Sequence, residues 1–218
     1  MGTEAIDFAG LLCARLCHDL LSPIGALGNG LELLAQENDP EMQAQCLDLL
    51  AQSSRAALNK LKFFRLAFGA AGGLGDMIDV PDLYAAMSGI FPTSKNVKIV
   101  WHIGAPQVSK PTVKLLLNLG LIVGEALVKG GQLDLALEQR GTRTEIVVRG
   151  EGERIVLDPA IRQTLEGDRA TDPLSPRLAP AWMVAQIART LGPGLQVSPP
   201  DASYLLIGAV LAAEPARG

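Results

Sequence analysis

Apolar residues in the first 68 positions of the chain recur at helical spacing. From Cys13 onward they alternate at intervals of four and three residues, which is typical of a helix that packs along one stripe of its surface. The first stripe consists of Cys13, Cys17, Leu20, Ile24, Leu27, Leu31 and Leu34. The second stripe consists of Leu47, Leu50, Ser54, Ala57, Leu61, Phe64 and Phe68. The pattern predicts two antiparallel helices joined by a short turn at residues 36–39, with Asp39 capping the second helix and Pro40 in its first turn.

Further apolar residues lie beside both stripes, so that one hairpin cannot bury them all. They are Leu12, Leu16 and Leu21 on the first helix and Leu49 and Leu58 on the second. The simplest arrangement that covers them is a four-helix bundle made by two hairpins, and we therefore expect a homodimer. The alternative is that the rest of the same chain covers this surface.

The remainder of the chain alternates between helical and strand patterns. We expect helices at residues 80–91, 110–128, 159–166 and 179–191, and strands at 97–103, 132–138, 143–149, 195–198 and 203–211. Strand hairpins combined with helices predict a mixed sheet with the helices on one face. Four glycines within residues 69–76 mark a linker. The predicted class is therefore α+β, with a helical hairpin at residues 1–70 and an α/β sandwich at residues 77–218.

Charge and hydropathy exclude several classes of partner. The 19 Lys and Arg residues against 23 Asp and Glu residues leave a formal net charge of -4, which argues against a general binder of nucleic acid or of anionic membranes. No apolar stretch reaches the roughly 20 residues that a membrane span needs, and no basic segment of a signal peptide precedes the first apolar run. Three cysteines without a dense framework fit a reducing compartment. We therefore expect a cytoplasmic protein.

One of the two histidines lies where it can meet another protein. If Cys17 belongs to the first stripe, the ring of His18 points to solvent. Neutral imidazole is a good nucleophile near neutral pH, and the adjacent Asp19 can hold one ring nitrogen as N–H and leave the other free to attack. Arg15 and Ser22 share the helix face of His18. Two roles stay open for Arg15, which are docking a partner protein and forming an i,i+4 ion pair with Asp19.

A single exposed histidine on a helix usually has no function of its own. Here it lies in the first of two amphipathic helices that precede a linker and an α/β region, and this context favours a functional histidine. The other histidine, His102, follows Trp101 in an expected strand and is interpreted as a structural or surface residue. Metal binding by Cys13, Cys17 and His18 is disfavoured, because cysteines in a helix stripe are typically small core residues.

Residues 18–24, with the sequence HDLLSPI, resemble the H-box in the dimerisation and histidine phosphotransfer domain of two-component histidine kinases. The rest of the chain resembles the ATP-binding domain that follows in those kinases. The resemblance implies that His18 carries a phosphoryl group and that Asp19 assists its transfer. It also implies a supporting role for Ser22 in transfer or phosphatase chemistry.

The positions that bind nucleotide in those kinases differ here. Leu121 and Glu125 stand where the resemblance places two asparagines, the second of which helps to hold magnesium. Val148 stands where an aspartate would read adenine. The counterpart of the second glycine-rich box, residues 175–181, has the sequence SPRLAPA and contains no glycine. Because prolines lack N–H groups, a cradle for a triphosphate is difficult to build from this segment.

An intact H-box beside altered nucleotide boxes resembles the ChpT-type histidine phosphotransferases of alphaproteobacteria. The closest points of resemblance are residues 15–23 (RLCHDLLSP) and 65–70 (RLAFGA). The resemblance implies a chain that binds no ATP and no other cofactor. It implies transfer of a phosphoryl group from the receiver domain of a hybrid histidine kinase to the aspartate of a response regulator, with Mg²⁺ held by the partner's receiver domain. Leu21, Gly25 and Gly28 are candidates for the surface on which a helix of the receiver packs. The other interpretation is that they serve in helix packing within the bundle.

Two further functions stay open at this point. One is an ATP-dependent histidine kinase with divergent nucleotide boxes. The other is a non-catalytic dimeric adaptor for a response regulator, in which the H-box is only a docking surface. Incubation with labelled ATP and a His18→Ala variant would separate both from a phosphotransferase.

Overall fold

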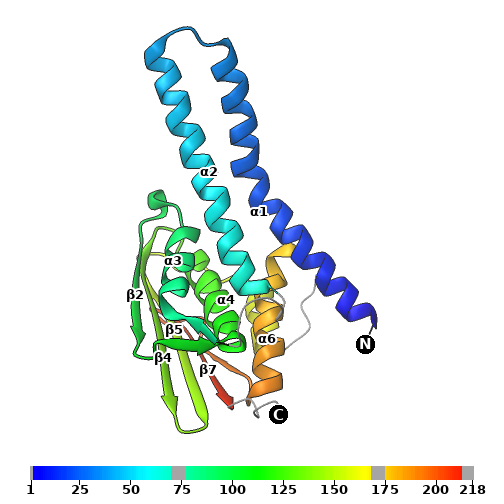
Figure 1. Ribbon diagram of the computed structural model, residues 1–218. Coiled ribbons are helices and arrows are strands. Elements are labelled where there is room, and N and C mark those ends of the chain that lie inside the picture. Colours follow the sequence, from blue (N-terminus) through cyan, green and yellow to red (C-terminus); the bar gives the residue numbers. More distant parts are fainter. Residues whose placement is uncertain (1, 70–76, 168–174, 213–218) are drawn as a thin grey trace.

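Figure 1 shows the computed structural model of the chain, which describes residues 2–69, 77–167 and 175–212. A long helical hairpin extends away from a body made of strands and shorter helices. Apart from Gly69, the predicted linker lies outside the described residues, and the domain boundary between residues 70 and 77 stays a prediction. Among the helices that the structure describes, none is long and apolar enough to span a membrane.

The hairpin consists of α1 (Gly2–Gln36) and α2 (Pro40–Phe68). As predicted, Pro40 begins the second helix and Asp39 caps it. Asp39 Oδ1 accepts a hydrogen bond from the Glu41 N–H at 3.1 Å. A capping side chain satisfies one of the free N–H groups in the first turn of a helix, so the start of α2 is set by its own local sequence.

Only part of each predicted stripe is covered within the chain. The covered or partly covered members are Leu20, Leu27, Leu34, Leu50, Ser54, Ala57, Phe64 and Phe68. The exposed members are Cys13, Cys17, Ile24, Leu31, Leu47 and Leu61. The interpretation of Cys13 and Cys17 as core residues is therefore wrong for the single chain. A helix of a bundle has two adjacent contact faces, and a spacing of three and four residues fits either of them, so the sequence pattern did not say which face meets the neighbouring helix.

The second part of the chain is built on a five-stranded sheet with the strand order β2-β4-β5-β7-β6. Its strands are β2 (Val97–Ile103), β4 (Gly131–Arg140), β5 (Arg143–Glu151), β6 (Leu195–Val197) and β7 (Leu205–Ala212). The sheet is mixed, as predicted, because β2 and β4 are parallel while the other neighbours are antiparallel. Two further strands, β1 (Met77–Asp79) and β3 (Gln107–Ser109), form a separate antiparallel pair. The sequence did not reveal this pair, because three residues are too few for an alternating pattern to show.

Helices cover one face of the sheet (Figure 1). They are α3 (Val80–Ile90), α4 (Lys110–Ala126), α5 (Pro159–Glu166) and α6 (Ala179–Leu191). The central helix is α4, in which residues 115–124 are all buried. A helix that is apolar on all sides belongs in the middle of a core. The structure thus confirms the predicted α+β class, with a helical hairpin followed by an α/β sandwich.

The base of the hairpin packs against this core. Phe63, Phe64 and Ala67 of α2 are buried in the same apolar core as α4, and Asn118 Nδ2 donates a hydrogen bond to the Ala67 carbonyl oxygen at 3.0 Å. The rest of the hairpin projects beyond the body (Figure 1). Its large exposed apolar residues include Leu21, Ile24, Leu31, Leu33, Leu47, Leu49, Leu58 and Leu61. The described residues of the second part of the chain leave these side chains exposed, so the alternative to a dimer does not account for them.

Candidate functional site

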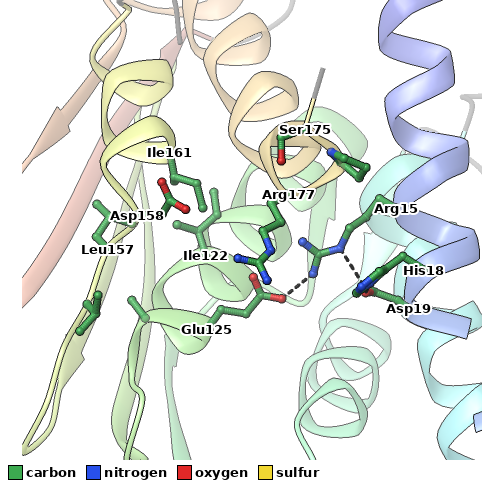
Figure 2. A pocket seen from close by; sticks show the side chains of 13 residues that line it. Arg15, His18, Asp19, Ile122, Glu125, Leu157, Asp158, Ile161, Ser175 and Arg177 are labelled. Atoms are coloured by element: carbon green, nitrogen blue, oxygen red, sulfur yellow. Dashed lines mark hydrogen bonds and ion pairs between the residues drawn. The ribbon is translucent and has the colours of Figure 1, made fainter. Parts of the chain in front are cut away.

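A cleft with a volume of about 440 Å³ lies where the hairpin meets the second part of the chain. The helix α1 contributes Arg15, His18 and Asp19 to its lining. The end of α4 contributes Ile122, Glu125 and Ala126, and the remaining lining comes from residues 156–158, from Ile161 and from the segment at 175–177 (Figure 2). The predicted H-box segment therefore borders a cleft that is formed by parts of the chain far apart in the sequence.

The ring of His18 faces solvent, as predicted from its place beside the helix stripe. Its side chain is 76% exposed, and its Nδ1 lies 3.0 Å from Asp19 Oδ1. An ionised carboxylate only accepts hydrogen bonds, so Nδ1 donates to Asp19, and in the neutral imidazole Nε2 is then the nitrogen that keeps its lone pair. The ring therefore presents a nucleophilic nitrogen to an approaching partner.

Both oxygens of the Asp19 carboxylate are engaged. While Oδ1 accepts from His18, Oδ2 accepts from Arg15 Nε at 2.7 Å. Burial by itself raises the pKa of Asp19, but the hydrogen bond with His18 and the charge of Arg15 outweigh burial, so the pKa lies below its ordinary value. The carboxylate consequently stays ionised at neutral pH and continues to accept from both neighbours.

The backbone of Asp19 has a contact of its own, which follows from Pro23. In a regular helix the Asp19 carbonyl would accept the N–H of residue 23, but proline has no N–H. Lys60 of α2 supplies a donor instead, since its Nζ lies 2.6 Å from the Asp19 carbonyl oxygen. Lys60 of the second helix thereby supplies the hydrogen-bond donor that Pro23 of the H-box segment cannot supply.

Arg15 joins Asp19 to Glu125 of α4. The Arg15 side chain is only 7% exposed, and its Nη2 lies 2.5 Å from Glu125 Oε1. Burial alone lowers the pKa of Arg15, but Glu125 and Asp19 raise it above its ordinary value, so the guanidinium keeps its charge. Of the two roles that the sequence left open for Arg15, the structure shows the i,i+4 ion pair with Asp19. A role for Arg15 in partner binding stays a prediction.

The other predicted site residues lie on the open surface of α1. Leu21 is 70% exposed and Ser22 is also exposed. A Cβ atom placed on Gly25 or Gly28 would meet no other side chain or element of the described structure within 4 Å. With His18, these residues follow each other at helical spacing along one uncovered strip of the helix. The strip has room for another protein, and the roles of its residues in transfer and partner binding stay predictions.

The positions that the kinase resemblance assigns to nucleotide binding do not fit that ligand. Leu121 and Val148 are buried in the apolar core, at 3% and 0% exposure. Glu125 is engaged by Arg15, and Pro176 begins the short helical turn that replaces the glycine-rich box. These positions therefore offer neither a carboxylate for adenine nor an amide for magnesium. Within the described ranges, no three His, Cys, Asp or Glu side chains gather as they would to hold a metal ion.

Sequence reasoning missed the contacts made by Glu125 and Lys60. Each residue is far from the H-box in the sequence, and neither lies in a motif that predicts contact with it. A signal for Glu125 was present, because it is the only charged residue in the stretch 115–128 and a charge in such a setting needs a partner. The signal for Lys60 was Pro23, which leaves a helix carbonyl without its usual donor.

Two comparisons with known sequences identify one family. Residues 80–203 match the family model of the histidine phosphotransferase C-terminal domain. Protein phosphotransferase ChpT of Brucella abortus is 33% identical over 189 residues, which cover 87% of this chain and 88% of the Brucella protein. The solved structure of a bacterial phosphotransferase is 32% identical and aligns with 94% of this chain and 96% of its own, with a TM-score of 0.79. The Acinetobacter baumannii histidine kinase AdeS is 14% identical and aligns with 91% of this chain and 98% of its own, with a TM-score of 0.46.

Proposed function

This chain belongs to the histidine phosphotransferase family, and on that premise we propose that it relays phosphoryl groups between receiver domains through His18. The observation that carries the proposal is the exposed imidazole of His18, whose Nδ1 is held by Asp19. This arrangement keeps Nε2 available for an electrophile. An exposed position also suits a nucleophile that has to enter the acidic pocket of another protein.

The first step takes the phosphoryl group from a receiver's phosphoaspartate. His18 Nε2 attacks phosphorus and forms an N–P bond, while the P–O bond to the receiver's aspartate breaks and leaves a carboxylate. Nδ1 keeps its proton, and the positive charge that develops on the ring is stabilised by ionised Asp19. In the second step the aspartate of another receiver attacks the phosphorus, and His18 leaves as neutral imidazole. The two steps together move one phosphoryl group and change no proton count.

We propose that the donor is the receiver of a hybrid histidine kinase and that the acceptor is a response regulator, with the relay taking place in the cytoplasm. The uncovered strip along α1 supports docking of a folded partner beside His18. Magnesium enters with the acidic pocket of the receiver, where it neutralises charge on the transferred group. ATP takes no part, because Leu121 and Val148 replace groups that would bind it and Glu125 is tied to Arg15.

Transfer from a purified, labelled phospho-receiver to the full chain tests this function. We expect label on the wild-type protein and on a His102→Ala variant, but none on a His18→Ala variant. His102 is the matched control, because it is the other histidine of the chain and its side chain is also exposed, at 58%. Label on the His18→Ala variant, or label on His18 from ATP in the absence of any phospho-receiver, would overturn the proposal.

A further inference from the structure

Local forces disfavour Glu125 at its position in α4. It lies in the last turn of the helix, where the partial negative charge of the helix end makes an acid unfavourable, and this turn holds no basic residue. It also interrupts a run of buried apolar residues. A residue that conflicts with its local setting is expected to make a compensating contact elsewhere in the fold.

That contact is the ion pair with Arg15, which lies 110 positions earlier in the chain. A guanidinium that is only 7% exposed needs acceptors for several N–H groups, and Asp19 alone engages only Nε. Glu125 Oε1 accepts a hydrogen bond from Arg15 Nη2 at 2.5 Å and so holds the far end of the guanidinium. Figure 2 shows Arg15 lying between the two carboxylates, with Glu125 on one side and Asp19 on the other.

The same chain of contacts continues to His18. Arg15 holds Asp19 Oδ2, and the remaining oxygen of that carboxylate, Oδ1, accepts from His18 Nδ1. With one oxygen fixed by a planar guanidinium, the carboxylate group cannot turn freely about its own axis. Its other oxygen is therefore kept directed at the histidine ring.

We infer that Glu125 is a positioning residue for His18, which acts through Arg15 and Asp19. Glu125 restrains the guanidinium, the guanidinium orients the carboxylate, and the carboxylate keeps the proton on Nδ1 and the lone pair on Nε2. The second part of the chain thereby controls the state of the phosphoryl carrier without touching the phosphoryl group. The consequence for transfer rests on the proposed function, whereas the effect on the imidazole does not.

The tautomer of His18 provides a direct readout. In wild-type protein labelled with ¹⁵N-histidine, we expect the nitrogen shifts at about pH 8, where imidazole is neutral, to show His18 with its proton on Nδ1. In Glu125→Gln and Glu125→Ala the shifts should move toward the Nε2–H form, which an unrestrained neutral histidine favours. The signals of His102 serve as an internal reference. Glu138→Gln is the matched control, since it removes the same charge from an exposed ion pair with Arg140.

Transfer kinetics add a second readout. From a labelled phospho-receiver, we expect Glu125→Gln to accept the phosphoryl group about 5- to 10-fold more slowly than wild type. In an Asp19→Asn background the same substitution should change the rate less than about twofold, because the contact through which Glu125 acts is already lost. If Glu125 served only to join α1 to α4, its removal would slow transfer equally in both backgrounds.

The two hypotheses fail in different ways. An unchanged His18 tautomer in both Glu125 variants, each shown by its unfolding curve to be folded, would overturn the positioning role. A tautomer that moves as expected in a protein that accepts no phosphoryl group from any receiver would support the positioning role and contradict the proposed function.

Discussion

Burial and electrostatics act in opposite directions on Asp19. Loss of water favours the neutral carboxyl group, yet the hydrogen bond with His18 and the charge of Arg15 keep the pKa of Asp19 below its ordinary value. The same two contacts orient the carboxylate toward the imidazole. One acidic residue thus connects the stability of α1 with the chemistry of the proposed phosphoryl carrier.

Replacing Asp19 by asparagine should expose this stabilisation as a pH dependence. Because the pKa of Asp19 is lower in the folded than in the unfolded protein, the carboxylate stabilises the fold above its unfolded-state pKa and ceases to do so as the pH falls through its folded-state pKa. Near neutral pH we expect the free energy of unfolding of Asp19→Asn to be about 1–2 kcal/mol below that of wild type. The difference should shrink below about pH 4.

Denaturant unfolding between about pH 7 and about pH 3 measures this difference. Asp48→Asn, at an exposed position on α2, controls for the loss of a carboxylate on the same hairpin. A difference between wild type and Asp19→Asn that stayed constant over the whole range would show that the charge of Asp19 is not what stabilises the fold.

At the scale of elements, α1 and α2 are joined at the H-box by a polar contact as well as by apolar packing. Pro23 lies inside α1 and leaves the Asp19 carbonyl without its helical donor. Lys60 Nζ fills that place from α2 at 2.6 Å. Lys60 thus supplies the donor that Pro23 lacks, and this hydrogen bond holds α1 and α2 together beside His18.

Replacing Lys60 by methionine should destabilise the hairpin, because it leaves that carbonyl without a donor while keeping much of the apolar stem. We expect a loss of about 1–2 kcal/mol in the free energy of unfolding, and partial recovery in Lys60→Arg, which restores a donor. Lys62→Met is the control, since Lys62 lies two positions along the same helix and is exposed. Equal losses for the two methionine variants would rule out the carbonyl contact as the cause.

At the scale of the whole molecule, apolar surface is distributed unevenly. The sheet and the base of the hairpin enclose a continuous core, whereas the projecting part of the hairpin keeps large apolar side chains in water, among them Leu31 and Leu47 at 59% and 55% exposure. Several large apolar side chains left exposed on one element favour an interaction site. A second copy of the chain would cover it by completing a four-helix bundle, which supports the proposed homodimer.

Sedimentation tests the dimer directly. We expect the wild-type protein at micromolar concentration to have twice the mass of one chain, and Leu31→Glu or Leu47→Glu to shift it toward the monomer, because each places a charge in the apolar interface. Val128→Glu, at a site that is 50% exposed just beyond α4, should leave the dimer intact. A wild-type monomer, or dissociation by Val128→Glu as well, would contradict the bundle.

Local signals in the sequence were sufficient to predict most of the helices and strands. Asp39 and Pro40 mark the start of α2, and alternation of apolar residues located β2 at its observed bounds. His18 is exposed, as predicted, although Cys17 of the neighbouring stripe is exposed as well. The predicted helices at residues 159–166 and 179–191 also coincide with α5 and α6. These features depend on residues close in the sequence, so the pattern of the sequence by itself determined them.

Only the tertiary structure decided which face of α1 is covered and what surrounds His18. The spacing of the stripe fits either of two adjacent helix faces. Which of the two is buried depends on the elements that pack against each face. Arg15 and Glu125 are 110 positions apart, and Asp19 and Lys60 are 41 positions apart. Such contacts arise because the packing of α4 and α2 brings distant charges to one place, and local periodicity carries no information about distances across the fold.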